Sequence, residues 1–70
     1  MYGQRIRELR LDMDMTQAQL AEVLNTTQRN VSKYEMEYLD LSTATLIRLC
    51  NFFEVSADYI LGIEENFPKI

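Results

Sequence analysis

Apolar side chains recur along this chain at the three- and four-residue spacing of helices. Between Gly3 and Gly62 there is neither glycine nor proline, so the turn signals of hairpins are missing. The apolar positions that carry the helical pattern are Ile6, Leu9 and Met13; Leu20, Ala21 and Leu24; Val31 and Tyr34; Leu46, Leu49, Cys50 and Phe53; Ile60 and Leu61. The pattern predicts an all-α fold with five helices.

Four of the expected helices begin with the same device, a hydroxyl residue at the N-cap. Such a side-chain oxygen can accept a hydrogen bond from the free N–H groups of the first turn. Gln19 completes a capping box with Thr16, and Gly62 is a stop signal for the last helix. The four N-cap residues are Thr16, Thr27, Ser42 and Ser56.

These signals place the helices at about 3–13, 17–24, 28–35, 43–53 and 57–62. A chain of 70 residues has room for one small domain and no second one. We expect the helical domain to span residues 1–63. Residues 64–70, which include Pro68, are expected to form a loose C-terminal tail.

The composition excludes several classes of site. The chain has no histidine and one cysteine, so an internal disulfide and a zinc site are excluded. Its two separated glycines exclude a glycine-rich phosphate loop. Cys50 falls on an apolar stripe, which predicts a buried, inert thiol. With no acid, base or nucleophile of catalytic type, we expect no enzyme, no cofactor and no metal.

No apolar run approaches the ~20 residues that span a bilayer, and the N-terminus has no signal-peptide core. We therefore expect a cytoplasmic protein with no membrane partner. The formal net charge is −4, but the charge is uneven. Residues 1–33 carry five basic and four acidic residues, whereas residues 34–70 carry two and seven. A polyanion could bind only through the first half.

Residues 17–36 have the organisation of a helix-turn-helix. A helix is followed by a break of about three residues and then by a second helix. Ala21 is small where two helices must approach closely, and Asn25 tolerates the positive φ that the turn needs. Val31 faces inward one turn into the second helix.

Five segments resemble, in the same order, the Cro and phage-repressor (XRE) family of helix-turn-helix DNA-binding domains. They are RIRELR, TQAQLAEVL, VSKYE, TLIRLC and SADYILG, and they span about residues 4–62. The resemblance implies a compact five-helix lambda-repressor-like fold. It also implies a sequence-specific transcriptional regulator, a repressor, that inserts its third helix into the major groove of double-stranded DNA. Such a protein would act as a homodimer on a pseudo-palindromic operator.

The third helix, about 28–35, would then be the recognition helix. One exposed face can carry Gln28, Arg29 and Lys33, opposite Val31 and Tyr34. Glutamine can form two hydrogen bonds to adenine, and arginine can form two to guanine. The residues expected to contact bases are Gln28, Arg29, Lys33 and Asn30.

The resemblance assigns other residues to the DNA backbone and to the fold. Gln17 matches the family position that contacts phosphate, at the N-terminus of the second helix. Thr27 and Ser32 are further candidates for DNA phosphate contacts. Arg10 and Glu35 match a family pair that ties the end of the first helix to the end of the recognition helix. That pair would be an orienting salt bridge.

The segment 36–41, after the recognition helix, holds four apolar residues, two acids and no cation. Within it, Tyr38 and Leu39 have no helical stripe to join, and an exposed apolar cluster marks a contact surface. In the resembled family, dimer contacts come from this loop and from the region of the last helix. The expected dimer contacts are Tyr38, Leu39, Tyr59 and Phe67.

Two alternatives stay open. Tyr38 and Leu39 could instead fold back over Phe52 and Phe53 and cap the core of a monomer. The acidic, apolar loop also favours a second function on the same scaffold, that of a protein-interaction module such as an antitoxin or an anti-repressor. Fold alone does not separate the two functions.

Overall fold

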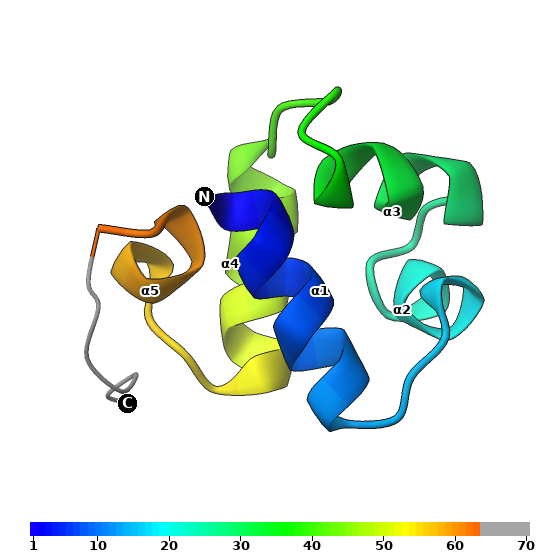
Figure 1. The fold of residues 1–70 in the computed structure, drawn as a ribbon, viewed down its shortest axis with the longest axis horizontal. Coiled ribbons are helices and arrows are strands. Elements are labelled where there is room, and N and C mark those ends of the chain that lie inside the picture. Colours follow the sequence, from blue (N-terminus) through cyan, green and yellow to red (C-terminus); the bar gives the residue numbers. More distant parts are fainter. Residues whose placement is uncertain (64–70) are drawn as a thin grey trace.

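The chain folds into five helices joined by short turns, as the computed structural model shows for residues 1–63 (Figure 1). The helices are α1 (Tyr2–Asp12), α2 (Gln17–Val23), α3 (Gln28–Glu35), α4 (Thr43–Phe53) and α5 (Ala57–Leu61). Each end lies within one residue of its predicted position, and residues 1–63 contain no strand. The all-α prediction is confirmed. The expected tail at 64–70 lies outside the described residues.

The four predicted N-caps all form. In each case the side-chain hydroxyl accepts a hydrogen bond from the backbone N–H three residues later, at 3.0–3.2 Å. Gln19 Oε1 also accepts from the backbone N–H of Thr16 at 2.8 Å, which completes the capping box. Because these bonds are local in sequence, the sequence alone could place the helix starts.

Left-handed backbone ends several of the helices. Asn25 adopts φ +56° as predicted, and Gly62 adopts φ +79° at the C-cap of α5. Asp14, Glu37 and Glu54 also adopt positive φ, between +55° and +62°. An L-residue in this region costs roughly 1–2 kcal/mol relative to glycine. Three acidic residues therefore occupy turn positions that local preference would give to glycine.

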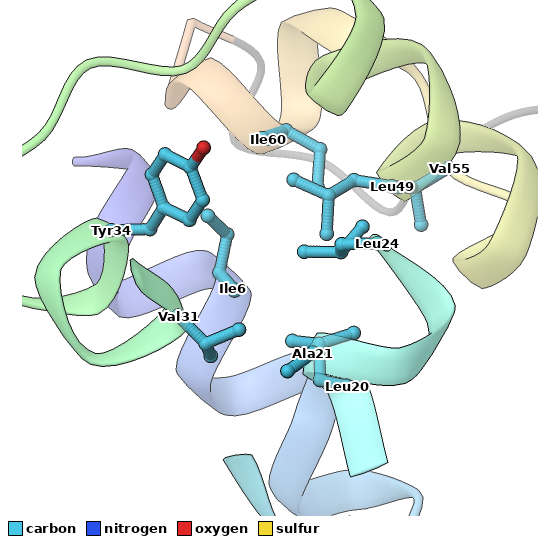
Figure 2. Close-up of a cluster of buried hydrophobic side chains, with 9 residues drawn as sticks. All are labelled: Ile6, Leu20, Ala21, Leu24, Val31, Tyr34, Leu49, Val55 and Ile60. Carbon is cyan, nitrogen blue, oxygen red and sulfur yellow. The ribbon is translucent and has the colours of Figure 1, made fainter. Parts of the chain in front are cut away.

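The core draws side chains from every helix (Figure 2). Two apolar positions of the predicted helical pattern lie outside the core: Met13 is 52% exposed at the end of α1, and Leu61 is 41% exposed on α5. Met13 follows the last helical residue of α1, so the helical period no longer directs its side chain inward. The buried apolar residues are Ile6, Leu20, Ala21, Leu24, Val31, Tyr34, Leu49, Val55 and Ile60.

The face of α1 that packs against the rest of the molecule carries Gly3, Ile6 and Arg10, all of them buried. Their spacing of three and four residues puts them on one side of the helix. At Gly3 the backbone of α1 comes so close to α3 that an added Cβ would lie 2.3 Å from the carbonyl oxygen of Glu35. The atom that the Cβ would meet belongs to the backbone, so it cannot move aside as a flexible side chain could.

A buried ion pair joins the other end of this face to α3. Arg10 Nε donates to Glu35 Oε2 at 2.7 Å, and Arg10 Nη2 donates to Glu35 Oε1 at 3.1 Å. The third guanidinium nitrogen, Nη1, donates to the carbonyl of Met15 at 2.8 Å. The two side chains are only 9% and 4% exposed. The salt bridge expected from the family resemblance is thus present, bidentate and shielded from water.

We expect Gly3→Ala to lower the free energy of unfolding by about 1–3 kcal/mol, the usual range for an overpacked site. Alanine is the better helix former by roughly 1 kcal/mol, so a loss would show that the close approach to Glu35 outweighs helix propensity. Urea denaturation followed by circular dichroism measures the change. Arg7→Ala, on the exposed side of α1, is the control and should shift stability by no more than about 0.5 kcal/mol. A stabilised Gly3→Ala protein would contradict the packing described here.

We expect Arg10→Met to lower the free energy of unfolding by about 3–5 kcal/mol, because it leaves the Glu35 carboxylate buried without its partner. The double variant Arg10→Met/Glu35→Met removes both charges and should recover most of that loss. Urea denaturation of the two single variants and the double variant gives the coupling between the side chains. A double variant as unstable as the sum of the single variants would show that the pair is not coupled.

Candidate nucleic-acid interface

Helices α2 and α3 form the predicted helix-turn-helix. Leu20 and Ala21 of α2 are buried together with Val31 of α3, so the two helices share one side of the core (Figure 2). The turn between them is closed by backbone bonds from Thr26 N–H to the carbonyl of Ala21 (2.9 Å) and from Asn25 N–H to that of Glu22 (3.2 Å). This pattern is a Schellman motif, in which the left-handed residue is Asn25.

The outer face of α3 is polar. Gln28 and Arg29 are exposed at its N-terminal end, and Lys33 is half-buried one turn later. Val31 and Tyr34, on the opposite face, are buried. The side chains of Gln28 and Arg29 form no hydrogen bond or ion pair with residues 1–63, so their polar groups are available for an external partner. The arrangement is that of a helix which can enter a groove with its N-terminal half.

Three further predicted contact residues are engaged within the protein. Asn30 Nδ2 donates to Thr26 Oγ1 at 2.9 Å, so the amide of Asn30 is oriented by the turn. Thr27 Oγ1 caps α3 by accepting from the backbone N–H of Asn30. Ser32 Oγ lies 3.9 Å from Met36 Sδ, in a weak hydrogen bond. Each of these groups keeps hydrogen-bonding capacity, but none is as unconstrained as Gln28 or Arg29.

Gln17, at the start of α2, is held by the buried ion pair. Its Nε2 donates to Glu35 Oε1 at 3.1 Å, and the same oxygen accepts from Arg10 Nη2. One carboxylate therefore links α1, α2 and α3. An amide nitrogen carries two hydrogens, so the second N–H of Gln17 can serve another acceptor. The Arg10–Glu35 part of this link was expected from the family resemblance, but the bond from Gln17 was not, because nothing local connects two residues 18 positions apart.

The segment after α3 turns back onto the start of α1. A second Schellman motif ends α3, with bonds from Tyr38 N–H to the carbonyl of Lys33 (2.8 Å) and from Glu37 N–H to that of Tyr34 (3.1 Å). The Glu37 carboxylate then accepts from the backbone N–H of Gly3 at 3.2 Å. These contacts were not predicted from the sequence.

Tyr2 makes the second contact of α1 with this segment. Its hydroxyl donates to the carbonyl of Leu39 at 3.0 Å. Burial raises the pKa of the Tyr2 phenol, and the negative charges of Asp40 and Glu37 raise it further. The hydroxyl therefore stays protonated and remains a donor.

The residues expected at a dimer interface differ in how exposed they are. Tyr38 is 75% exposed, whereas Leu39 is half-buried against the core. Tyr59 also packs against the core, and the guanidinium of Arg5 lies over its ring at 4.4 Å. Phe67 lies outside the described residues. Of the apolar loop, Tyr38 and Met36 are thus the exposed side chains.

Other kinds of site find little support in the part of the chain that is described. Residues 1–63 contain no group of three or more side chains that could hold a metal ion. Burial raises the pKa of the half-buried Cys50 thiol, which favours the unreactive protonated form. Among the helices of residues 1–63, none has the length and apolar character needed to cross a membrane.

Comparison with known proteins gives consistent matches. A sequence model of the helix-turn-helix family matches residues 6–60. The chain is 44% identical over 67 residues to the HTH-type transcriptional regulator ImmR of Bacillus subtilis (strain 168), covering 96% of this chain and 53% of ImmR. It is 37% identical to the uncharacterized HTH-type transcriptional regulator YobD of the same organism, covering 63% of that protein. The chain thus spans between half and two thirds of the length of these curated relatives.

A solved structure shows the same fold. The P22 c2 repressor, crystallised in complex with a synthetic operator, superimposes with a TM-score of 0.85 at 25% identity. The match covers 91% of this chain and 97% of the repressor chain. The family match, the relatives and the shared architecture agree with the five-helix arrangement described above. This chain belongs to the helix-turn-helix family of the Cro and phage-repressor (XRE) type.

Proposed function

We propose that this chain is a transcriptional regulator, a repressor, that binds a specific sequence of double-stranded DNA with α3 in the major groove. The observation that carries the proposal is the exposed N-terminal end of α3. There the side chains of Gln28 and Arg29 form no hydrogen bond or ion pair with the described residues, and the opposite face of the helix is buried in the core. The P22 c2 repressor structure, a repressor with its operator, supports DNA as the partner.

Each residue then has a role that follows from its surroundings. Gln28 and Arg29 read base edges, and Lys33 and Asn30 add contacts from the next part of the helix face. Gln17 uses its free amide hydrogen on a phosphate, and the hydroxyls of Thr27 and Ser32 are further phosphate ligands. Arg10 and Glu35 do not touch DNA but hold α3 at its angle.

The charge distribution agrees with this orientation. Arg29 and Lys33 lie on α3, whereas Glu54 and Asp58 lie near the C-terminal end of α4 and on α5. Figure 1 shows α2 and α3 on one side of α1 and α5 on the other. The acidic residues of the α4–α5 end are thus kept away from the face that would meet a polyanion. A regulator of this kind works on the chromosome, so we place the protein in the cytoplasm.

The proposed protein binds its operator as a homodimer. Tyr38 and Met36 are exposed next to the end of α3, and an exposed apolar pair at that place supports self-association. Two-fold pairing there would set two copies of α3 about 34 Å apart, one turn of the duplex.

A second candidate function rests on the same two exposed residues, Met36 and Tyr38. An apolar surface in a loop that also carries Glu37 and Asp40 favours a protein partner, as in an antitoxin or an anti-repressor.

We expect Arg29→Ala to lower affinity for a selected operator by about 1–3 kcal/mol and to relax preference at one base position. Gln17→Ala should instead weaken binding to all sequences alike, because phosphates carry no sequence information. Random-site selection with the purified protein, followed by titration of the selected duplex, measures both effects. Unchanged affinity and preference in Arg29→Ala would contradict the placement of α3 in the groove.

We expect Tyr38→Asp to reduce self-association and operator affinity together while the helical circular dichroism stays unchanged. Tyr38 is the better position for this test, because Leu39 is half-buried and its substitution would also disturb the core. Equilibrium sedimentation, with and without the operator duplex, gives the oligomeric state. A wild-type protein that stays monomeric even on DNA would rule out the homodimer. A protein that selects no DNA sequence but binds a protein partner through Tyr38 would favour the second function.

A further inference from the structure

The first turn of α1 obtains its cap from a residue far along the chain. Met1, at the N-cap, makes no side-chain cap hydrogen bond. Glu37, 34 residues away, supplies the acceptor instead, with its Oε2 atom 3.2 Å from the backbone nitrogen of Gly3. A carboxylate at this end of an 11-residue helix is favoured by the helix dipole as well as by the hydrogen bond.

The backbone of Glu37 is in a conformation that glycine adopts more easily. Its φ is +62°, and it is the left-handed residue that ends α3. Asp14 and Glu54 adopt the same region, so the backbone alone assigns no role to the side chain, and the role at position 37 rests on the hydrogen bond to Gly3. Here the side chain is the group that joins the end of α3 to the start of α1. A glycine at position 37 would relieve the backbone and lose that connection.

The hydrogen bond between Gly3 and Glu37 lies where α1 contacts the C-terminal end of α3. Gly3 lies directly against the Glu35 carbonyl, and the Tyr2 hydroxyl holds Leu39 two residues beyond Glu37. An eight-residue helix is about 12 Å long, so a tilt of roughly 10° at its C-terminal end moves its N-terminal end by about 2 Å. That end carries Gln28 and Arg29. A displacement of this size exceeds the tolerance of a hydrogen bond to a base edge.

We infer that Glu37 is a positioning residue for DNA recognition: by capping α1 it sets the tilt of α3 together with the Arg10–Glu35 pair, and so places Gln28 and Arg29. The inference rests on the DNA binding proposed above and adds a residue that does not itself reach the DNA. This role predicts that DNA sequence selection and protein stability, which usually change together, change independently at position 37. Loss of the acceptor oxygen that Glu37 offers to Gly3 alters sequence selection, while relief of the left-handed backbone preserves stability.

The test compares Glu37→Gly with a control matched in charge and backbone, Glu54→Gly. Glu54 ends α4 in the same left-handed region, with φ +57°, and its side chain forms no hydrogen bond or ion pair with the described residues. Both variants remove one acid and one strained residue, but Glu37→Gly alone removes the cap of α1. The conservative variant Glu37→Gln keeps an acceptor oxygen for the Gly3 N–H and loses only the charge.

The first measurement does not depend on DNA. Amide residual dipolar couplings of the free protein report the orientation of α3 relative to α1. We expect Glu37→Gly to change the α3 couplings and to shift the Gly3 amide resonance. Glu37→Gln, which exchanges the carboxylate acceptor for an amide oxygen, should shift the Gly3 resonance but leave the α3 couplings as in the wild type, and Glu54→Gly should change neither. Urea denaturation should give no loss of stability in Glu37→Gly. Unchanged α3 couplings in Glu37→Gly would overturn the inference, whatever the protein does with DNA.

The second measurement is affinity for the selected duplex and for a scrambled duplex. Glu37→Gly should bind the selected duplex about tenfold more weakly, in the range of one weak base contact, and the scrambled duplex as wild type does. Glu37→Gln and Glu54→Gly should keep the wild-type ratio of the two affinities within about threefold. A wild-type ratio in Glu37→Gly overturns the inference. A wild-type protein that selects no sequence overturns the proposed function instead, and the dipolar couplings alone then decide whether Glu37 positions α3.

Discussion

The orientation of the helix-turn-helix depends on one desolvated carboxylate, that of Glu35. Charges that lose their water must be paired, or the fold bears a penalty of several kcal/mol. The guanidinium of Arg10 meets both carboxylate oxygens, and the amide of Gln17 shares one of them. A packing of α3 that shifted it along α1 would separate these groups. The ion pair therefore selects one arrangement of the three helices. The hydrophobic core constrains their relative position less, because apolar contacts have no preferred direction.

Much of the fold could be predicted from the sequence, because its signals are local. Hydroxyl N-caps on α2 to α5 and apolar residues at helical spacing placed the five helices. The same reasoning placed Leu20, Ala21 and Val31 in the core and gave Asn25 its positive φ. The exposed polar face of α3 also followed, since residues opposite a buried stripe must face outward, and its role in DNA recognition remains a proposal. The Arg10–Glu35 pair came from the family resemblance, because nothing local links residues 25 positions apart.

What the sequence could not show depends on long-range contacts. In the sequence Gly3 is an ordinary glycine, but in the structure it packs against the carbonyl of Glu35. Likewise, Glu37 has the sequence features of a solvated acid, but its carboxylate accepts a hydrogen bond from α1. Local preference would assign glycine to the left-handed position that Glu37 occupies. The apolar loop was ambiguous for the same reason. Its neighbours Tyr38 and Leu39 look alike in sequence, and tertiary packing leaves the first exposed and half-buries the second.

The separation of the two faces of α3 has an evolutionary consequence. Val31, Tyr34 and Glu35 hold the helix, whereas the side chains of Gln28 and Arg29 form no hydrogen bond or ion pair with residues 1–63. Mutations at positions 28 and 29 are therefore nearly neutral for folding and fall directly on the surface that would read DNA. If these positions read DNA as proposed, such a scaffold would acquire a new operator by substitutions at two codons while it stays folded. Descendants of one ancestral domain could diverge rapidly in the genes they control while remaining superimposable in structure.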